Sequence, residues 1–244
     1  GPREGNLSDL QNLEKLDNII DQEISKKIHV ITKFRMKSNL GCDQHIPIAI
    51  SKVLEICDGV IVLEDDIRIS ESGVMNIADK LNQVIKDGES NPVVGMSGIS
   101  PLNNFWASFN FWRTSHYFTA WGFALTSKFW KFHNSLNINI ENQSSLIEPL
   151  LRNKKWRELS NRKKFIWLER FNRGNYDYKI QLSMFLGGIT SYAPAFRIVD
   201  NVGHNRIDAS HTNHKKPSYL KISVFNHTHH FQERGFIARV FRPF

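Results

Sequence analysis

Three consecutive acidic residues, Glu64, Asp65 and Asp66, directly follow an apolar run at residues 60–63. A short, wholly apolar run predicts a strand buried on both faces, and we expect it to be the most buried strand of the protein. Carboxylates at such a strand end are costly unless a cation or hydrogen-bond donors compensate them. Mg²⁺ or Mn²⁺ would suit this position, because these ions take one or two carboxylates and leave places for substrate phosphates. The alternative is that the acids solvate a turn or cap the following helix.

Another acidic residue, Asp177, lies just ahead of an apolar stripe of helical spacing. This spacing predicts a helix with Asp177 in its first turn, where the helix dipole favours the ionised carboxylate. An electrostatic helix cap would account for that placement. A general base that stays deprotonated and faces a cleft would account for it equally.

An aromatic segment at residues 115–123 has no clear period and contains Trp121 and Gly122. Such a segment belongs either to a core or to a platform for a sugar ring. His211 lies in a polar, turn-rich segment at residues 201–212 and is a candidate metal ligand or phosphate contact, with a surface histidine as the ordinary alternative. Three further histidines fit no closed zinc site, since their spacing is wrong and cysteine partners are missing: His227, His229 and His230.

The elements that would position these residues alternate between helices and strands in the first hundred residues. Helical spacing predicts helices around residues 10–20, 46–57 and 74–85, and short apolar runs predict strands at residues 28–31, 60–63 and 93–96. This alternation predicts an α/β fold with a mostly parallel sheet flanked by helices. Ligands of such sheets bind beyond the carboxyl ends of the strands, where Glu64, Asp65 and Asp66 fall. Beyond residue 100, a helix is predicted from Ser127 and a strand at residues 189–193.

Length and composition set outer bounds on the kind of protein. The chain has 244 residues, of which 41% are hydrophobic and 23% charged, and these values exclude long disorder, collagen and coiled coil. No apolar run reaches the roughly 20 residues that a membrane span needs. Two cysteines make no disulfide framework, which favours a reducing compartment such as the cytoplasm. Residues 1–100 hold a single aromatic, Phe34, and the other 27 lie beyond, so we expect two halves, 1–100 and 101–244, with different tasks.

The net charge is +8, which indicates an anionic partner such as nucleic acid, phosphate or acidic lipid. Residues 152–164 hold seven basic residues and one acidic residue. This stretch is either a solvated helix and loop or a patch for phosphate or a membrane surface. The tail at residues 231–244 mixes arginine with phenylalanine, which adds to the hypothesis of peripheral membrane attachment.

Four blocks of the sequence, in order over residues 29–212, resemble the bacterial sugar transferases of GT-A fold that are related to N-acetylglucosaminyltransferase I. The first block is Asn39-Leu40-Gly41, a helix, residues 61–66 and Ser70. The second runs from Ser115 through Trp121 and Gly122 to Trp130. The third is residues 175–181, and the fourth runs from Asn201 to Thr212.

The resemblance implies a metal-dependent, inverting glycosyltransferase that moves a sugar from a nucleotide-diphosphate sugar to a glycan or lipid-linked acceptor. It implies that Asp66 binds the metal, Mn²⁺ or Mg²⁺, and that Asp177 is the catalytic base; His211, a candidate from its polar segment, would be a further metal ligand. It places the following residues beside the nucleotide sugar: Arg35, Asn39, Glu64 and Asp65. Residues 1–100 would form the nucleotide-sugar half and residues 101–244 the acceptor half of one continuous domain. The protein would be cytoplasmic, peripheral on the inner face of the cytoplasmic membrane, with no nucleic-acid partner.

The sequence also departs from the family pattern. Tyr176 and Gln181 stand where tryptophans are expected, and Phe123 replaces the second tryptophan of the second block. These changes leave the metal site intact and affect the expected acceptor or sugar pocket, which is Trp121, Gly122 and Tyr176. The family opens with a strand–helix unit that binds the nucleobase, and we expect the sequence given to begin after such a unit, because Gly1-Pro2-Arg3 is similar to the end of the segment that follows it. Gly1-Pro2 would equally fit the residues that a protease leaves after cleavage.

Two other classes of function use the same features. A metal-dependent nuclease or phosphodiesterase would use the acids and a basic surface, but such sites converge several carboxylates on two metals. A non-catalytic basic adaptor for membrane or nucleic acid would bind with steep salt dependence and would not need Asp66.

Overall fold

The computed structural model describes residues 5–25, 34, 36, 38–95, 112–138, 143–194 and 198–202. The chain divides into two compact units, Gly1–Ser51 and Lys52–Phe244. The first unit contains helix α1 (Leu7–Ser25) and most of α2 (Cys42–Leu54), which confirms the two predicted helices. The apolar stripe of α1 is solvent-exposed, with Leu10 at 52% and Leu16 at 50%. The strand predicted at residues 28–31 lies outside the described residues.

The second unit is built on a five-stranded mixed sheet flanked by helices, which confirms the α/β class. Its strands are β1 (Gly59–Val62), β3 (Val93–Val94), β4 (Trp112–Ser115), β5 (Phe123–Thr126) and β6 (Ser191–Pro194), in the order β1-β5-β3-β6-β4. The sheet contains strands from both sides of residue 100. The proposed division of labour at that residue stays a prediction.

The expectation of a mostly parallel sheet is wrong. Among the described strands only β3 and β6 pair in parallel, whereas β1–β5, β3–β5 and β4–β6 are antiparallel. Because β1 and β3 both run antiparallel to β5, they run in the same direction as each other. The strand–helix–strand unit β1–α3–β3 therefore exists as its alternation predicts, and β5 lies between its two strands. Alternation of strands and helices along the chain predicts the relative direction of consecutive strands. It does not predict which later strand lies between them.

The prediction that the strand at residues 60–63 is the most buried is also wrong. Among the described strands β1 lies at the edge of the sheet, where it pairs with β5, and all four of its residues are half-buried. Leu63 lies beyond the strand and is 43% exposed. The buried centre is instead β3 and β5, where Val93 and Leu125 are fully covered. An apolar run cannot distinguish a central strand from an edge strand whose faces are covered by helices.

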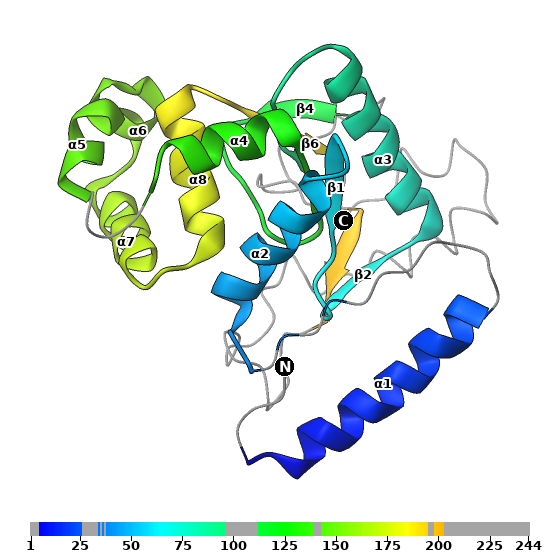
Figure 1. Ribbon diagram of the computed structural model, residues 1–244. Helices are drawn as coiled ribbons and strands as arrows, with labels where there is room; N and C mark the ends of the chain where they lie inside the picture. The colour runs from blue at the N-terminus through cyan, green and yellow to red at the C-terminus, as the bar shows by residue number, and fades with distance from the viewer. Residues whose placement is uncertain are drawn as a thin grey trace, which may run out of the picture. The chain divides into compact units, whose positions relative to one another are not determined.

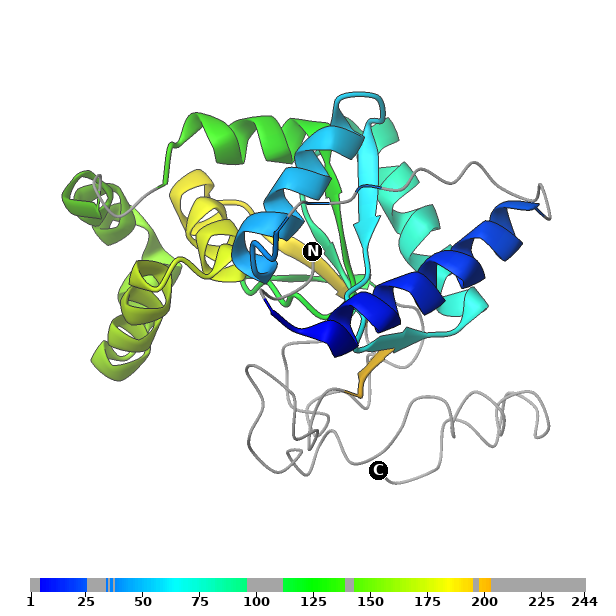
Figure 2. The ribbon, with the colours of Figure 1, turned by 60° about the horizontal axis from the view of Figure 1, so that its bottom comes forward.

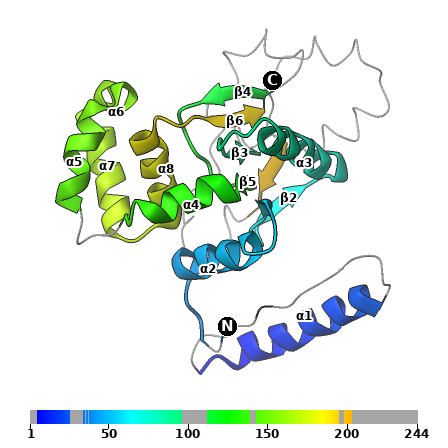
Figure 3. The ribbon, with the colours of Figure 1, turned by 45° about the horizontal axis from the view of Figure 1, so that its top comes forward.

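Helix α3 (Glu71–Lys86) packs on one face of the sheet through Ile77, Leu81 and Val84. It begins at Ser70, whose hydroxyl accepts a hydrogen bond from the Gly73 amide. Ala124 of β5 belongs to the same cluster, whereas the neighbouring Phe123 lies 6.3 Å from the ring of Tyr176 in α8. Successive strand residues point to opposite faces, so α3 and α8 cover opposite sides of the sheet (Figure 3).

Beyond β5 the second unit is mainly helical. Helix α4 (Ser127–Ser135) begins at the predicted position and leads to α5 (Gln143–Arg152), α6 (Lys154–Glu158), α7 (Asn161–Asn172) and α8 (Tyr176–Gly187). Helices α5, α6 and α7 group together beside α8 (Figures 1 and 2) and share one core with it, which includes Leu150, Trp156, Phe171 and Phe185. We call residues 143–174, which span α5 to α7, the helical lobe. Each described helix is either too short or too polar to cross a bilayer.

A two-stranded antiparallel ribbon stands beside the main sheet. It joins β2 (Ile67–Ile69) to β7 (Val199–Asn201), with Ile67 opposite Asn201. The ribbon brings the segment that follows Asp66 against a segment more than a hundred residues later in the chain. The start of the predicted turn-rich segment at residues 201–212 is thus the end of a strand, and residues 203–212 lie outside the described residues.

Candidate functional site

The three consecutive acids occupy the turn between β1 and β2. The turn closes with a hydrogen bond of 3.0 Å from the Ile67 amide to the Glu64 carbonyl oxygen. Asp65 points into solvent, and Glu64 and Asp66 are half-buried. The carboxylates therefore lie at the carboxyl end of β1, as the sequence indicates, although that strand is at the edge of the sheet.

Asp66 is held in place by the ribbon strand β7. The Asn201 side-chain amide donates a hydrogen bond of 3.0 Å to Asp66 Oδ2, and the Val202 amide donates one of 2.8 Å to the Asp66 carbonyl oxygen. Asn201 is almost fully buried, at 2% exposed. The other carboxylate oxygen, Oδ1, is buried and has no hydrogen-bond partner among the described residues. A fixed carboxylate with one oxygen left over is suited to a cation or to a donor that a ligand supplies.

Helix α8 brings a further carboxylate and a tyrosine to this turn. The helix starts after Gly174, and its first two residues are Tyr176 and Asp177, which confirms the predicted place of Asp177 in a first turn. Tyr176 is 5% exposed, and its hydroxyl donates a hydrogen bond of 2.7 Å to Glu64 Oε1. The tyrosine that replaces an expected tryptophan is thus a buried contact between α8 and the acidic turn.

The electrostatics of Glu64 show that four carboxylates gather here. Burial raises the pKa of Glu64 above its ordinary value, whereas the hydrogen bond from Tyr176 acts in the opposite direction. The negative charges of Asp66, Asp177 and Asp65 raise the pKa of Glu64 further. We call these four residues the acidic cluster. Like charges held together under partial burial cost stability and are common at functional sites, which makes the cluster a candidate for one.

The cluster is not a closed metal centre by itself. No group of three or more His, Cys, Asp or Glu side chains within the described ranges is arranged to hold a metal ion. The donor chemistry does fit a Mg²⁺ or Mn²⁺ ion that takes one protein carboxylate, through the unpartnered Oδ1 of Asp66, and its other oxygens from substrate phosphates and water. The other candidate ligand, His211, lies outside the described residues.

The helix-cap interpretation of Asp177 stays open beside the expectation that it is a base. Asn175 occupies the N-cap position of α8 but makes no side-chain capping hydrogen bond. The negative charge of Asp177 therefore complements the helix dipole where side-chain capping is missing. Its electrostatic effect on Glu64 connects the same charge to the cluster.

The aromatic segment has structural roles that the sequence did not disclose. Gly122 adopts a left-handed backbone with φ of 62°, and a Cβ there would lie 2.7 Å from Val199 Cγ1, so close packing on β7 requires glycine. Trp121 beside it is half-buried. Gln181 of α8 is buried, accepts a hydrogen bond from the Phe118 amide and donates one of 2.9 Å to the His116 carbonyl oxygen. The segment is thereby tied to α8, and a pocket for sugar at Trp121 stays a prediction.

Two residues that the resemblance gives to the nucleotide lie in the first unit. The side chain of Asn39 accepts a hydrogen bond of 2.8 Å from the Gly41 amide and so shapes the turn that precedes α2. Gly41 has a left-handed backbone, with φ of 69°, at this turn. Arg35 lies outside the described residues. A nucleotide contact by either residue stays a prediction.

The sequence does not indicate that Asn201 belongs to the site, and it indicates Tyr176 only as part of a sugar or acceptor pocket. In the structure Asn201 orients Asp66, and the hydroxyl of Tyr176 orients Glu64. The place of Asn201 at the head of the fourth block is the one signal that points to it. No periodicity or spacing could have paired residues 135 and 112 positions apart.

No family model, curated protein or solved structure matches the chain. The function must therefore be inferred from the chemistry of the acidic cluster. The resemblance to the GT-A sugar transferases stays an expectation from the sequence.

Proposed function

We propose that the protein is a glycosyltransferase that moves a sugar from a nucleotide-diphosphate donor to a hydroxyl group of a glycan or lipid-linked acceptor. The observation that carries the proposal is the acidic cluster, in which Asp66, positioned and with an unpartnered oxygen, and Asp177 of another element both act electrostatically on Glu64. A donor site needs a place for a cation and its diphosphate. An acceptor site needs a carboxylate that stays ionised. The GT-A arrangement proposed for the fold accords with both needs.

Asp66 is the residue that would hold the ion. Its Oδ2 is occupied by Asn201, so Oδ1 is the oxygen available to a cation. A bound Mg²⁺ or Mn²⁺ supplies Lewis-acid stabilisation of the charge on the leaving diphosphate. Glu64 is less suited to this role, because it already accepts a hydrogen bond from Tyr176 and burial favours its protonated form.

Asp177 would act on the acceptor. Its carboxylate removes the proton of the acceptor hydroxyl as that oxygen forms a bond to the anomeric carbon, and the bond from that carbon to the diphosphate breaks. Attack from the face opposite the leaving group inverts the anomeric configuration. The first turn of α8 favours the ionised carboxylate that this step requires. Trp121 is proposed to line the sugar pocket, and the site is proposed to work in the cytoplasm.

Thermal shift with a panel of nucleotide-diphosphate sugars, with and without Mn²⁺, tests the proposal. We expect one donor to raise the melting temperature only when Mn²⁺ is present, since ligands that bind the folded state stabilise it by mass action. Asp66→Asn should abolish this Mn²⁺-dependent shift without lowering the melting temperature of the free protein. Asp79→Asn on the exposed face of α3 is the matched control and should leave the shift intact.

Two outcomes would overturn the proposal. Equal Mn²⁺-dependent donor binding by the wild type and Asp66→Asn would show that Asp66 does not bind the metal. Mn²⁺-dependent hydrolysis of nucleic acid or of a phosphodiester, with no response to any nucleotide sugar, would make the protein a phosphodiesterase.

A further inference from the structure

Positive charge is concentrated in the helical lobe. Residues 143–174 contain nine basic and three acidic residues, a net charge of +6 within a chain whose total is +8. The basic residues are Arg152, Lys154, Lys155, Arg157, Arg162, Lys163, Lys164, Arg170 and Arg173. One short part of the chain thus carries most of the charge that indicates an anionic partner.

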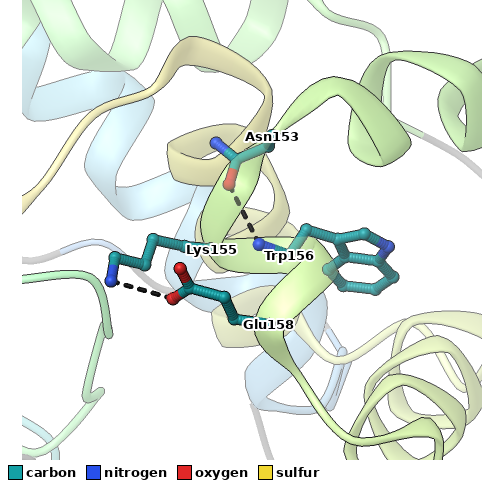
Figure 4. Close-up of polar contacts among 4 residues, drawn as sticks. All are labelled: Asn153, Lys155, Trp156 and Glu158. Carbon is teal, nitrogen blue, oxygen red and sulfur yellow. Dashed lines mark hydrogen bonds and ion pairs between the residues drawn. The ribbon is translucent and has the colours of Figure 1, made fainter.

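Each acidic residue of the lobe is paired with a cation of its own helix or cap. Glu148 bonds to Arg152 at 2.5 Å, Glu158 to Lys155 at 2.9 Å and Glu169 to Arg173 at 2.6 Å. Figure 4 shows the Lys155–Glu158 pair on the side of α6 away from the Trp156 ring. Six cations therefore remain without an ion-pair partner among the described residues: Lys154, Arg157, Arg162, Lys163, Lys164 and Arg170.

Three of these cations, Lys154, Arg162 and Lys163, stand at helix starts, where they work against the stability of the helices. Helix α7 begins at the N-cap Ser160 and has no acidic residue in its first turn, which holds Arg162 and Lys163. Helix α6 likewise starts with Lys154 and Lys155 and has no acid there. The helix dipole is positive at this end and disfavours cations. Helix stability therefore does not account for these three basic residues.

Large apolar side chains are exposed beside this charge. Phe165 of α7 is 69% exposed and lies one turn after Arg162, on the same face of the helix. On α5, Ile147 and Leu151 are 48% and 53% exposed and also lie one turn apart. Another side of α7 is buried through Phe171, so the exposure of Phe165 is not a sign of an unpacked helix.

We propose that the helical lobe docks on a membrane surface that carries anionic lipid. Its unpaired cations would attract the headgroup phosphates, and Phe165 would enter the interface between headgroups and acyl chains. The exposed apolar residues favour a membrane over nucleic acid, because a phosphate backbone gives such side chains no apolar environment. This inference does not depend on the proposed glycosyl transfer.

Sedimentation with vesicles of phosphatidylcholine, with and without phosphatidylglycerol, tests the proposal on the full chain. We expect binding only to the vesicles that contain phosphatidylglycerol. Each cation near such a surface contributes about fivefold to binding, so R162E/K163E should bind at least about 25-fold more weakly. The melting temperature of this variant should not fall, because glutamate is favoured in the first turn of a helix.

Matched variants distinguish vesicle binding by the lobe from a general effect of the protein's positive charge. K86E/K131E removes the same charge from exposed positions on α3 and α4 and should retain most of the binding. Phe165→Ser should weaken binding, whereas Met75→Ser, at a side chain 55% exposed on α3, should not. Equal losses in the two double variants would overturn the proposal. So would tighter binding to duplex DNA than to vesicles with no effect of Phe165→Ser.

Discussion

The acidic cluster and the helical lobe differ in how their charged side chains are arranged. In the lobe, every acid has a cationic neighbour within its own helix or cap, and the excess cations are mostly exposed. In the cluster, carboxylates from the turn after β1 and from the start of α8 gather under partial burial. Excess charge on a surface costs little because water screens it, whereas gathered buried charge is costly. The cluster is therefore the stronger indication of a ligand site, and the lobe of a docking surface.

The largest expected effect is on catalysis. Asp177→Asn keeps the size of the side chain but cannot accept a proton, so turnover should fall by about 100-fold or more while donor binding is retained. The change in stability should be small, because the substitution removes repulsion within the cluster and also removes a charge that the dipole of α8 favours. Transfer to the acceptor, or the slower hydrolysis of the donor, is the assay, with Asp79→Asn as control. Full turnover in Asp177→Asn would leave only the helix-cap role for this residue.

Helix α8 links the two regions, because it starts at the cluster and packs Leu182 and Phe185 into the lobe core. Its Ser183 is hydrogen-bonded to His133 Nδ1 of α4 at 2.6 Å. The Ser183 hydroxyl also donates to the Lys179 carbonyl oxygen, so the neutral histidine ring donates through Nδ1. Burial, with a smaller effect of Lys179, lowers the pKa of His133 to about 4.

This shift predicts a loss of stability in acid. The unfolded chain binds a proton at His133 below its ordinary pKa of 6.5, whereas the folded protein does so only near 4. The stability that depends on a neutral His133 is present above pH 6.5 and is lost as the pH falls toward 4, by about 3 kcal/mol in total. Urea denaturation at stepped pH is the measurement, and His133→Phe should flatten the curve in this window. The raised pKa of Glu64 acts in the opposite sense, since protonation relieves the cluster. Parallel curves for the wild type and His133→Phe would contradict the prediction.

A smaller effect is expected from the contact between α8 and the acidic turn. Tyr176→Phe removes the hydrogen bond to Glu64 and leaves a half-buried carboxylate without that donor. The free energy of unfolding should fall by about 1–2 kcal/mol, measured in urea at neutral pH. In the double variant Tyr176→Phe/Glu64→Gln, the loss of unfolding free energy should be smaller than the sum of the single changes, because the buried charge of Glu64 is gone. Simple additivity would mean that the hydrogen bond has no energetic role.

The smallest expected effect is a change in melting temperature that has opposite signs in the two regions. Glu64→Gln keeps an oxygen for the Tyr176 hydroxyl and removes repulsion from Asp66 and Asp177, so it should raise the melting temperature slightly. Glu158→Gln in the lobe should lower it slightly, because the hydrogen bond from Lys155 lowers the pKa of Glu158 and favours its charge. Differential scanning of both variants at neutral pH gives the comparison. A lower melting temperature for Glu64→Gln, as for Glu158→Gln, would show that the cluster carries no electrostatic cost.

Several elements could be predicted because their signals are local. The helical spacing at residues 74–85 reflects the buried face of α3, and Ser70 supplies its cap. The apolar run at residues 60–63 predicts β1 to within a residue, and the polar start of α8 places Asp177 correctly. The order of the strands across the sheet was not predicted. Among the described strands β1 lies at the sheet edge, and β5 lies between β1 and β3. Pairing partners come from distant segments, and no local pattern specifies them.

The sequence alone determined which groups the protein has for chemistry: three acids after a strand, another in the first turn of a helix, and an excess of cations at residues 152–164. Tertiary structure decided which of them act together. Asn201 and Tyr176 hold Asp66 and Glu64 through side-chain hydrogen bonds that span more than a hundred residues, and the start of α8 brings Asp177 to the same turn. The reason is physical, because residue type and spacing fix charge and local conformation, whereas burial and the proximity of charges arise only when distant segments pack.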